Sequence, residues 1–332
     1  MGIKELNKFL QSNCANGITN TTLHEFNSKK VAIDVSIFLY KFILKEKNII
    51  EGFLAQIYKL RQFNITPVYV FDGIPPKEKD NTIKLRNDRK KNYSLKIEKL
   101  NEEYENCLNE SKSILIKQEL ERLRKKNIRI TNSHISDLKD MLDKLGIKHV
   151  TPESEADTYC SALCSNNIVD FCISDDMDLL ASNCSVLVRN FNNFSNNVIK
   201  YELDTILSNL DITYRQWLDF CILCGCDYTK RIRGLTPSQA YDLIKKYETI
   251  DSIIEKCDTS DIKFPYDFNY NDARNIFLQY SDMKFLRNRF NFNIPYLWGD
   301  EFEKIKCYLK KRTNLSYKIL DIRLKKIYKI KR

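Results

Sequence analysis

The chain has 332 residues, of which 43% are hydrophobic and 30% are charged, and its formal net charge is +10. This balance is typical of a folded globular protein and excludes an intrinsically disordered chain. The longest apolar stretch, 31–40, contains Asp34 and Ser36 and is too short to span a bilayer, and the first residues lack a hydrophobic signal core. We therefore expect an intracellular protein with no membrane segment.

Three short apolar runs end in acidic turns. They are Val31–Asp34, Pro67–Asp72 and Val169–Ile173, and the last is followed by the acidic segment 174–178. Because β-branched residues dominate and polar alternation is absent, each run predicts a buried parallel strand. Residues 53–61 between the first two runs show helical spacing. The order strand, helix, strand predicts an α/β fold with a doubly wound, mostly parallel sheet flanked by helices.

The acidic turns are expected to meet at one edge of this sheet. In doubly wound sheets, ligands bind outside the carboxyl ends of the strands, and all three turns fall there. A single aspartate at a strand end is commonly a helix N-cap. Several crowded carboxylates repel one another unless a cation neutralises them, so the pattern favours a cation site.

Residues 80–130 mix lysine, arginine and glutamate densely and contain no glycine or proline. This composition predicts long charged helices that project from the body. The alternative is a solvent-facing helical hairpin without a function of its own.

Residues 215–250 read as helix, tight turn, helix, with Gly234 in the turn and Pro237 at the start of the second helix. Such a turn can present backbone N–H groups to a phosphate.

The C-terminal end is strongly basic. Residues 304–332 hold twelve lysines and arginines against one acid, Asp321, whereas residues 1–303 hold 42 bases and 43 acids. A basic segment on a nearly neutral body indicates a polyanionic partner. Two alternatives are a solvated tail and a helix that folds back through its apolar residues, 319–327.

The eleven cysteines are expected to be reduced because their number is odd, the chain is large and most lie in apolar runs. Cys221, Cys224 and Cys226 form a cluster that suits zinc only with further ligands, and no second Cys or His pair stands at a suitable distance. We interpret these residues as packing groups.

Six ordered blocks carry a resemblance to a known family. They are MGIKELNKFL, VAIDVSIFLYKFI, PVYVFDGIPPKEK, TPESEAD, ISDDMDLL and CILCGCDYTKRIRGLTPSQAYDLI. Together they resemble the signature blocks of the flap endonuclease family, the XPG-like structure-specific 5′ nucleases. The resemblance implies a PIN-like nuclease fold with a helical arch and a helix-hairpin-helix DNA-binding element. It also implies a metal-dependent phosphodiesterase that acts at junctions of double- and single-stranded DNA.

On this basis we expect a single nuclease domain over residues 1–300 and a basic tail over 301–332. Its parts would be an N-terminal nuclease part (1–79), the helical arch (80–130), an internal nuclease part (131–228) and the helix-hairpin-helix element (229–262).

The family's carboxylates would bind two Mg²⁺ ions, with Mn²⁺ as a substitute, because these hard ions prefer oxygen ligands. By motif they fall on Asp34, Asp72, Glu155, Asp157, Asp176, Asp178 and Asp227. We place the first three around one ion and the last three around the other, with Asp157 shared or acting through water. A monovalent cation at the helix-hairpin-helix turn is a further expectation.

The resemblance assigns catalytic roles to Lys79 and Arg86, which lie two helical turns apart at the base of the arch and would stabilise the attacked phosphate. Tyr40 would stack on a base, although a place in the core is the alternative. The expected DNA-binding residues are Gly2, Tyr40, Lys84, Arg89, Arg233, Gly234 and Thr236.

The sequence departs from the cellular relatives in three places. The link at Lys45–Ile50 is short, which puts selectivity for a 3′ flap in doubt; Thr236 replaces a glycine; and no sliding-clamp peptide precedes Arg332. We expect a monomer that binds flap, nick or junction DNA in the nucleus or at a site of DNA replication. The alternatives are a 5′-3′ exonuclease or junction resolvase of the same superfamily, and a catalytically silent DNA-binding scaffold.

Overall fold

The computed structural model describes residues 2–46, 48–256, 262–283, 290, 292–295 and 299–329. Its strands are β1 (Ile18–Thr22), β2 (Lys30–Asp34), β3 (Thr66–Val70), β4 (His149–Val150), β5 (Phe171–Ile173), β6 (Val186–Arg189) and β7 (Asn197–Glu202). Its α-helices are α1 (Leu6–Asn13), α2 (Val35–Glu46), α3 (Ile49–Gln62), α4 (Asp80–Glu105), α5 (Glu110–Lys126), α6 (Asn132–Lys144), α7 (Ala156–Ser165), α8 (Asp178–Ala181), α9 (Leu203–Leu210), α10 (Tyr214–Cys224), α11 (Pro237–Tyr247), α12 (Ile250–Lys256), α13 (Tyr270–Phe277), α14 (Gly299–Arg312) and α15 (Tyr317–Ile327). Within the described ranges, no helix combines the length and apolar character that crossing a bilayer requires.

The seven strands form one sheet in the order β1-β7-β6-β5-β2-β3-β4. Strands β6, β5, β2, β3 and β4 run parallel, whereas β7 pairs antiparallel with both of its neighbours, β6 and β1. The mostly parallel, helix-flanked sheet predicted from the sequence is confirmed.

Helices cover both faces of the sheet because its central strands are apolar on both sides. Val31 and Ile33 of β2 and Phe171 of β5 enter one core with α2, α3 and α6. Ala32 of β2 and Cys172 of β5 enter the opposite core with α1, α7 and α10. Successive side chains of a strand point to opposite faces, so a fully apolar run requires a helical layer on each side.

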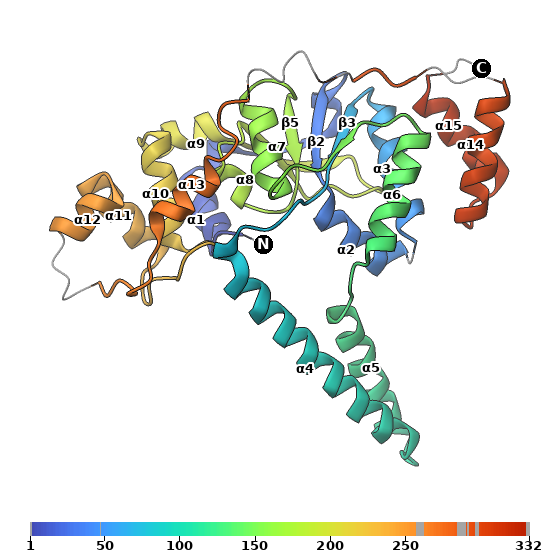
Figure 1. The fold of residues 1–332 in the computed structure, drawn as a ribbon, viewed down its shortest axis with the longest axis horizontal. Helices are drawn as coiled ribbons and strands as arrows, with labels where there is room; N and C mark the ends of the chain where they lie inside the picture. The colour runs from blue at the N-terminus through green and yellow to red at the C-terminus, as the bar shows by residue number, and fades with distance from the viewer. Residues whose placement is uncertain are drawn as a thin grey trace.

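Helices α4 and α5 project together from the body as a hairpin (Figure 1). Helix α4 has no buried residue, whereas Ile116, Leu120 and Leu123 of α5 are buried at the contact between the two helices. A helix with so few apolar residues has nothing to bury against the sheet, which explains its exposure. The charged helices predicted for residues 80–130 are therefore present, and we call them the arch.

The segment 301–332, which was expected to be a tail, is folded into helices in the part that the structure describes. Residues up to 329 form α14 and α15, and Leu320, Leu324 and Ile327 of α15 are fully buried in the core that α3 shares. The Nε of Arg61 in α3 donates to the carbonyl of Ile327 at 3.2 Å. These leucines and isoleucine lie four and three residues apart on one helix face, and burying that face outweighs the solvation of the lysines on the other. Lys331 and Arg332 lie outside the described residues.

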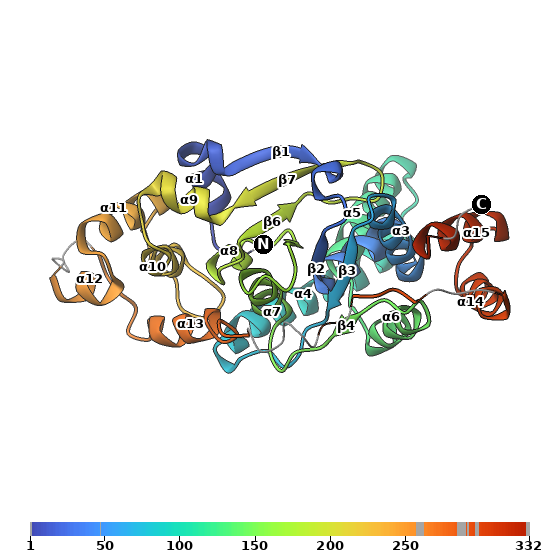
Figure 2. The same cartoon turned by 90° about the horizontal axis from the view of Figure 1, so that it is seen from above.

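The outermost helices lie on opposite faces of the sheet. Helices α10 to α13 join the core that contains α1 and α7, and α14 and α15 join the core that contains α2, α3 and α6, so the two groups stand at opposite ends of the molecule (Figures 1 and 2). The helix, turn and helix expected within 215–250 correspond to α10 and α11. The arch leaves the body between these ends (Figure 1).

Candidate active site

The carboxyl ends of β2, β3 and β5 bring the predicted aspartates to one edge of the sheet. Asp34 ends β2 and pairs in register with Val70 of β3, two residues before Asp72. The hydroxyl of Ser174, which follows β5, donates to Asp34 Oδ2 at 3.0 Å. Ser36 joins two of the acids, because its backbone N–H donates to Asp34 and its hydroxyl donates to Asp72.

The N-terminus of α7 adds Glu155 and Asp157 to this edge. Glu155 is the N-cap of α7, and Asp157 lies in its first turn. The backbone N–H of Ala156 donates to Asp72 Oδ1 at 2.9 Å, which fixes the start of α7 against the end of β3. The hydroxyl of Tyr228 donates to Glu155 Oε2 at 2.6 Å.

The base of the arch closes the site with two cations. Lys79 forms an ion pair with Glu155, and its Nζ lies 3.8 Å from Asp227 Oδ2. Arg86, the second of the two predicted catalytic residues, donates to Asp227 Oδ2 at 2.7 Å. Asp227 follows α10, so these contacts join the arch to the helix-turn-helix end of the molecule.

Burial and mutual repulsion dominate the electrostatics of the site. Burial, followed by the negative charges of Asp72 and Asp176, raises the pKa of Asp34 to about 8. Burial is also the main cause of the raised pKa values of Asp157 and Asp178. At Lys79 burial disfavours the charged form, but the nearby carboxylates of Asp157, Glu155 and Asp227 outweigh it and raise the pKa. The acids therefore favour an added positive charge.

The donor set fits hard divalent cations. All seven predicted ligands offer carboxylate oxygens, and Asp34, Glu155, Asp157 and Asp178 are buried. Among the described residues, no three carboxylates place an oxygen within 4.8 Å of one another. Like-charge repulsion explains this spacing. Oxygen ligands of this kind are preferred by Mg²⁺ and Mn²⁺.

The N-terminal backbone packs directly on the acids. The N–H of Ile3 donates to Asp178 Oδ1 at 2.8 Å. Gly2 adopts a φ of +83°, and a Cβ at this position would collide with carboxylate oxygens of Asp176 and Asp178. Glycine is required here for both its backbone conformation and its lack of a side chain.

Sequence reasoning missed four groups that orient the acids. They are the N–H of Ile3 and the side chains of Ser36, Ser174 and Tyr228. The three side chains stood within two residues of a predicted acid, so adjacency was a usable signal. Which acid each would contact depends on the tertiary structure.

A cavity of about 710 Å³ lies beneath the arch, between α2 and α4. Its lining includes Tyr40 and Lys41 of α2 and Arg86, Arg89 and Tyr93 of α4. Tyr40 is 39% exposed, so it is not a core residue, and Lys90 lies 5.3 Å from the centre of its ring. Lys84 is exposed on α4. The predicted DNA contacts Tyr40 and Arg89 thus share this cavity, and Lys84 does not line it.

The predicted phosphate turn before α11 is partly closed by its own residues. Thr236 is the N-cap of α11, and its hydroxyl accepts from the N–H of Gln239 while Gln239 accepts from the N–H of Thr236. This capping box consumes two N–H groups. Gly234 has a φ of +81° with open space around it, and together with Arg233 it lines a cavity of about 510 Å³.

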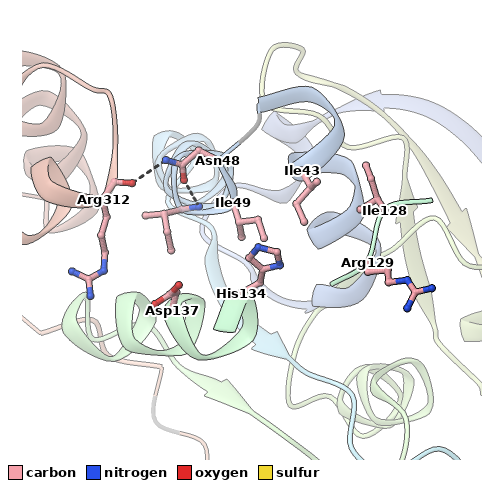
Figure 3. Close-up of a pocket in the computed structure, with 9 residues that line it drawn as sticks. Ile43, Asn48, Ile49, Ile128, Arg129, His134, Asp137 and Arg312 are labelled. Atoms are coloured by element: carbon pink, nitrogen blue, oxygen red, sulfur yellow. Dashed lines mark hydrogen bonds between the residues drawn. The ribbon is translucent and has the colours of Figure 1, made fainter. Parts of the chain in front are cut away.

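A further cavity of about 450 Å³ lies beside the short link between α2 and α3 (Figure 3). The amide of Asn48, the N-cap of α3, donates to the carbonyl of Arg312 at 2.9 Å, and its oxygen accepts from the N–H of Ile50 in the first turn. His134 and Asp137 of α6 lie on the opposite wall (Figure 3). The link is thus tied to the end of α14.

Comparison with known proteins gives a consistent result. Residues 1–93 match the XPG N-terminal domain, and residues 146–227 match the XPG I-region. The chain is 34% identical to flap endonuclease 1 of Enterocytozoon bieneusi (strain H348), over 83% of this chain and 77% of that protein. It is 32% identical to flap endonuclease 1 of Encephalitozoon cuniculi (strain GB-M1), over 89% and 86%. The fold is similar to the solved flap endonuclease-1 from Methanococcus jannaschii, with a TM-score of 0.65, 21% identity and coverage of 99% and 98%.

Proposed function

Because the chain belongs to the flap endonuclease family of structure-specific 5′ nucleases, we propose that it hydrolyses one phosphodiester of flap or junction DNA with the help of Mg²⁺. The observation that carries this proposal is the position of the arch. Its base places Lys79 and Arg86 on the acids that gather at the carboxyl edge of the sheet. An acidic site that also holds Lys79, the N-cap of α4, and Arg86 of α4 can bind a polyanionic strand once cations offset the charge of its acids.

Lys79 and Arg86 have two roles, which are to position the phosphate and to neutralise its charge. Lys79 and Arg86 bind the attacked phosphate and offset the charge that develops on its oxygens. In the absence of DNA they are held by Glu155 and Asp227. These ion pairs keep both cations at the site, so little reorganisation is needed when a phosphate replaces the carboxylate as their partner.

The acids provide the ligands for the metal. We propose that Asp34, Asp72 and Glu155 hold one ion, that Asp176, Asp178 and Asp227 hold the other, and that Asp157 serves both. Bound divalent ions would supply a nucleophile at neutral pH and neutralise the phosphate. Ser36, Ser174 and Tyr228 orient the carboxylates by donating hydrogen bonds to them.

The cavity under the arch supports a path for the 5′ strand. Tyr40 and Tyr93 present rings to it, and Arg86 and Arg89 present positive charge. Aromatic rings stack on any base, and basic side chains follow the backbone, so such a cavity holds single-stranded DNA without sequence preference. We propose that duplex DNA lies across Gly2, Arg233, Gly234 and Thr236, with a monovalent cation at the turn before α11.

The cavity beside Asn48 is a candidate binding site for the 3′ end at the junction. The link between α2 and α3 is short, yet the cavity that it borders has apolar walls and the polar groups Asn48, His134 and Arg312. We propose that this cavity receives a short 3′ flap.

A cleavage panel tests the proposed function against its alternatives. End-labelled 5′ flaps, nicks, gaps, blunt duplexes and four-way junctions are incubated with the full chain and Mg²⁺, with excess chelator as the control. We expect one main incision at the base of a 5′ flap and no product with chelator. Stepwise release of mononucleotides would favour an exonuclease, and paired symmetrical cuts would favour a resolvase. Binding without product on every substrate would favour a silent scaffold.

A flap carrying one additional unpaired 3′ nucleotide completes the panel. We expect faster or more uniform incision with this nucleotide, and loss of that advantage in Asn48→Ala. Equal incision of both substrates by the unaltered protein would remove the 3′ flap from the proposal and leave the nuclease activity in place.

A further inference from the structure

Three cysteines from three different elements meet in the core on one face of the sheet. Cys164 lies in the last turn of α7, Cys172 in the middle of β5, and Cys184 between α8 and β6. Their sulfur atoms all lie within 4.8 Å of one another. Among the described residues, this is the only group of three potential ligands that are so close together.

The surroundings of these sulfurs are apolar and closed. Cys172 and Cys184 are 0% exposed, and Cys164 is 2% exposed. Each thiol donates to a backbone carbonyl, Cys172 to that of Cys160 at 3.1 Å, Cys184 to that of Val186 at 3.4 Å and Cys164 to that of Asp170 at 3.8 Å. Packing alone would account for three small apolar groups in a core. It does not require three elements to direct their sulfurs to one point.

We propose that Cys164, Cys172 and Cys184 form a three-sulfur site for a single soft monovalent metal ion of the copper(I) class. Three sulfurs bound to one ion at about 2.3 Å lie roughly 4 Å apart, so only a small closure of the observed arrangement is needed. Thiolate ligands select soft ions. The site is distinct from the carboxylates, which offer only oxygen.

The number of ligands favours a monovalent ion over zinc. Structural zinc sites are almost always four-coordinate, and the described residues supply no fourth side-chain ligand within the group. Cysteine binds a metal as the thiolate, so binding of the ion releases thiol protons to the solvent.

The ion would connect α7 and β5, two of the elements that position the acids of the active site. Glu155 is the N-cap of α7, Asp157 lies in its first turn, and β5 leads to Asp176 and Asp178. A metal shared by α7, β5 and the segment before β6 ties these supports together. Since the ion binds the folded chain and not the separated ligands of the unfolded chain, it should raise the thermal unfolding temperature.

The test uses the full chain with Cys107→Ser and Cys307→Ser, which removes two thiols that are not buried. Copper(I) is titrated without oxygen against a chromophoric copper(I) chelator, with silver(I) as a redox-inert parallel and Zn²⁺ as the competing class. We expect one tightly held copper(I) or silver(I) ion per chain, a raised unfolding temperature and three sulfur neighbours by X-ray absorption. Tighter binding of Zn²⁺, or a copper spectrum with nitrogen or oxygen neighbours, would overturn the proposal.

Matched variants locate the site. Cys172→Ala and Cys184→Ala should each weaken copper(I) binding at least tenfold, whereas Cys14→Ala, at another fully buried cysteine, should not. Thermal unfolding without metal shows whether each variant is folded. If a variant at the trio does not fold, protection of the three thiols from alkylation by bound copper(I) in the parent chain replaces it. Equal binding by all three variants, or alkylation of the trio at the same rate with and without copper(I), would contradict the assignment.

Discussion

Arg86 of the arch donates a hydrogen bond to Asp227 Oδ2 at 2.7 Å and so ties α4 to the segment after α10. The guanidinium is half exposed, so a phosphate can reach it without unfolding of the arch. Lys79 has less freedom, because its side chain is only 12% exposed and is held by Glu155. A phosphate can therefore reach Arg86 more easily than Lys79, although both side chains lie at the carboxyl edge of the sheet.

Lys79→Ala and Arg86→Ala should each slow the chemical step by about 100-fold, because each removes one preorganised positive group from the attacked phosphate. Single-turnover cleavage with saturating enzyme measures this step, and a binding titration gives the Kd. We expect a small change in Kd. Lys117→Ala, at an exposed lysine of α5, is the control. If both variants only raise the Kd, the residues are ordinary backbone contacts.

Asp34→Asn should abolish cleavage and stabilise the metal-free protein. Burial and neighbouring acids raise the pKa of Asp34 from 3.8 to about 8, so the folded state binds a proton that the unfolded state has released. Stability without metal should therefore fall as the pH rises from about 4 to about 8. Thermal unfolding in chelator across this range should show a weaker fall in Asp34→Asn. Asp88→Asn, at an exposed residue of α4, should retain the fall of the parent chain.

Added Mg²⁺ should raise the unfolding temperature more at pH 8 than at pH 6. The ion binds deprotonated carboxylates, and burial together with neighbouring acids raises the pKa of Asp34 to about 8, so this carboxyl holds a proton at pH 6. Differential scanning calorimetry at several Mg²⁺ concentrations measures the shift. A shift that does not depend on pH would indicate that Mg²⁺ binds elsewhere.

Gly2→Ala should reduce single-turnover cleavage by at least about tenfold, because the added methyl displaces Asp176 and Asp178 and each 1.4 kcal/mol lost from the transition state costs a factor of ten. Gly299→Ala is a matched control, since Gly299 also has a positive φ, +57°, but has open space around its Cβ position. The control should lose some stability and keep its cleavage rate. Equal cleavage by both variants would show that Gly2 is required only for its backbone conformation.

The basic C-terminal helices should strengthen DNA binding without taking part in cleavage. Lys311, Lys318 and Lys326 are exposed, and changing all three to Gln leaves the buried face of α15 intact. Each phosphate contact adds about −0.9 to the slope of log affinity against log salt, so the slope should become shallower by up to about 2.7. Thermal unfolding confirms that the variant is folded. An unchanged slope would mean that this surface does not contact DNA.

Part of the site followed from local sequence and one topological rule. Apolar runs that end at Asp34, Asp72 and the acids after Ile173 indicated parallel strands, and parallel strands place their carboxyl ends at the same edge. The cap of α11 is equally local, because Thr236 and Gln239 stand three residues apart and each bonds the backbone of the other. Such features depend on neighbours within a few residues.

Other features depended on contacts between distant parts of the chain. The charge at 304–332 suggested a tail, but burial of Leu320, Leu324 and Ile327 against the core decided the outcome. Lys79 meets Glu155 across 76 residues, and the three cysteines converge from three elements. The sequence by itself determined the three central strands, the charged helices of the arch and the strand ends that carry acids, because these depend on local patterns of apolar and charged residues. Only the tertiary structure decided which side chains meet, because that depends on how the helices pack over the two faces of the sheet.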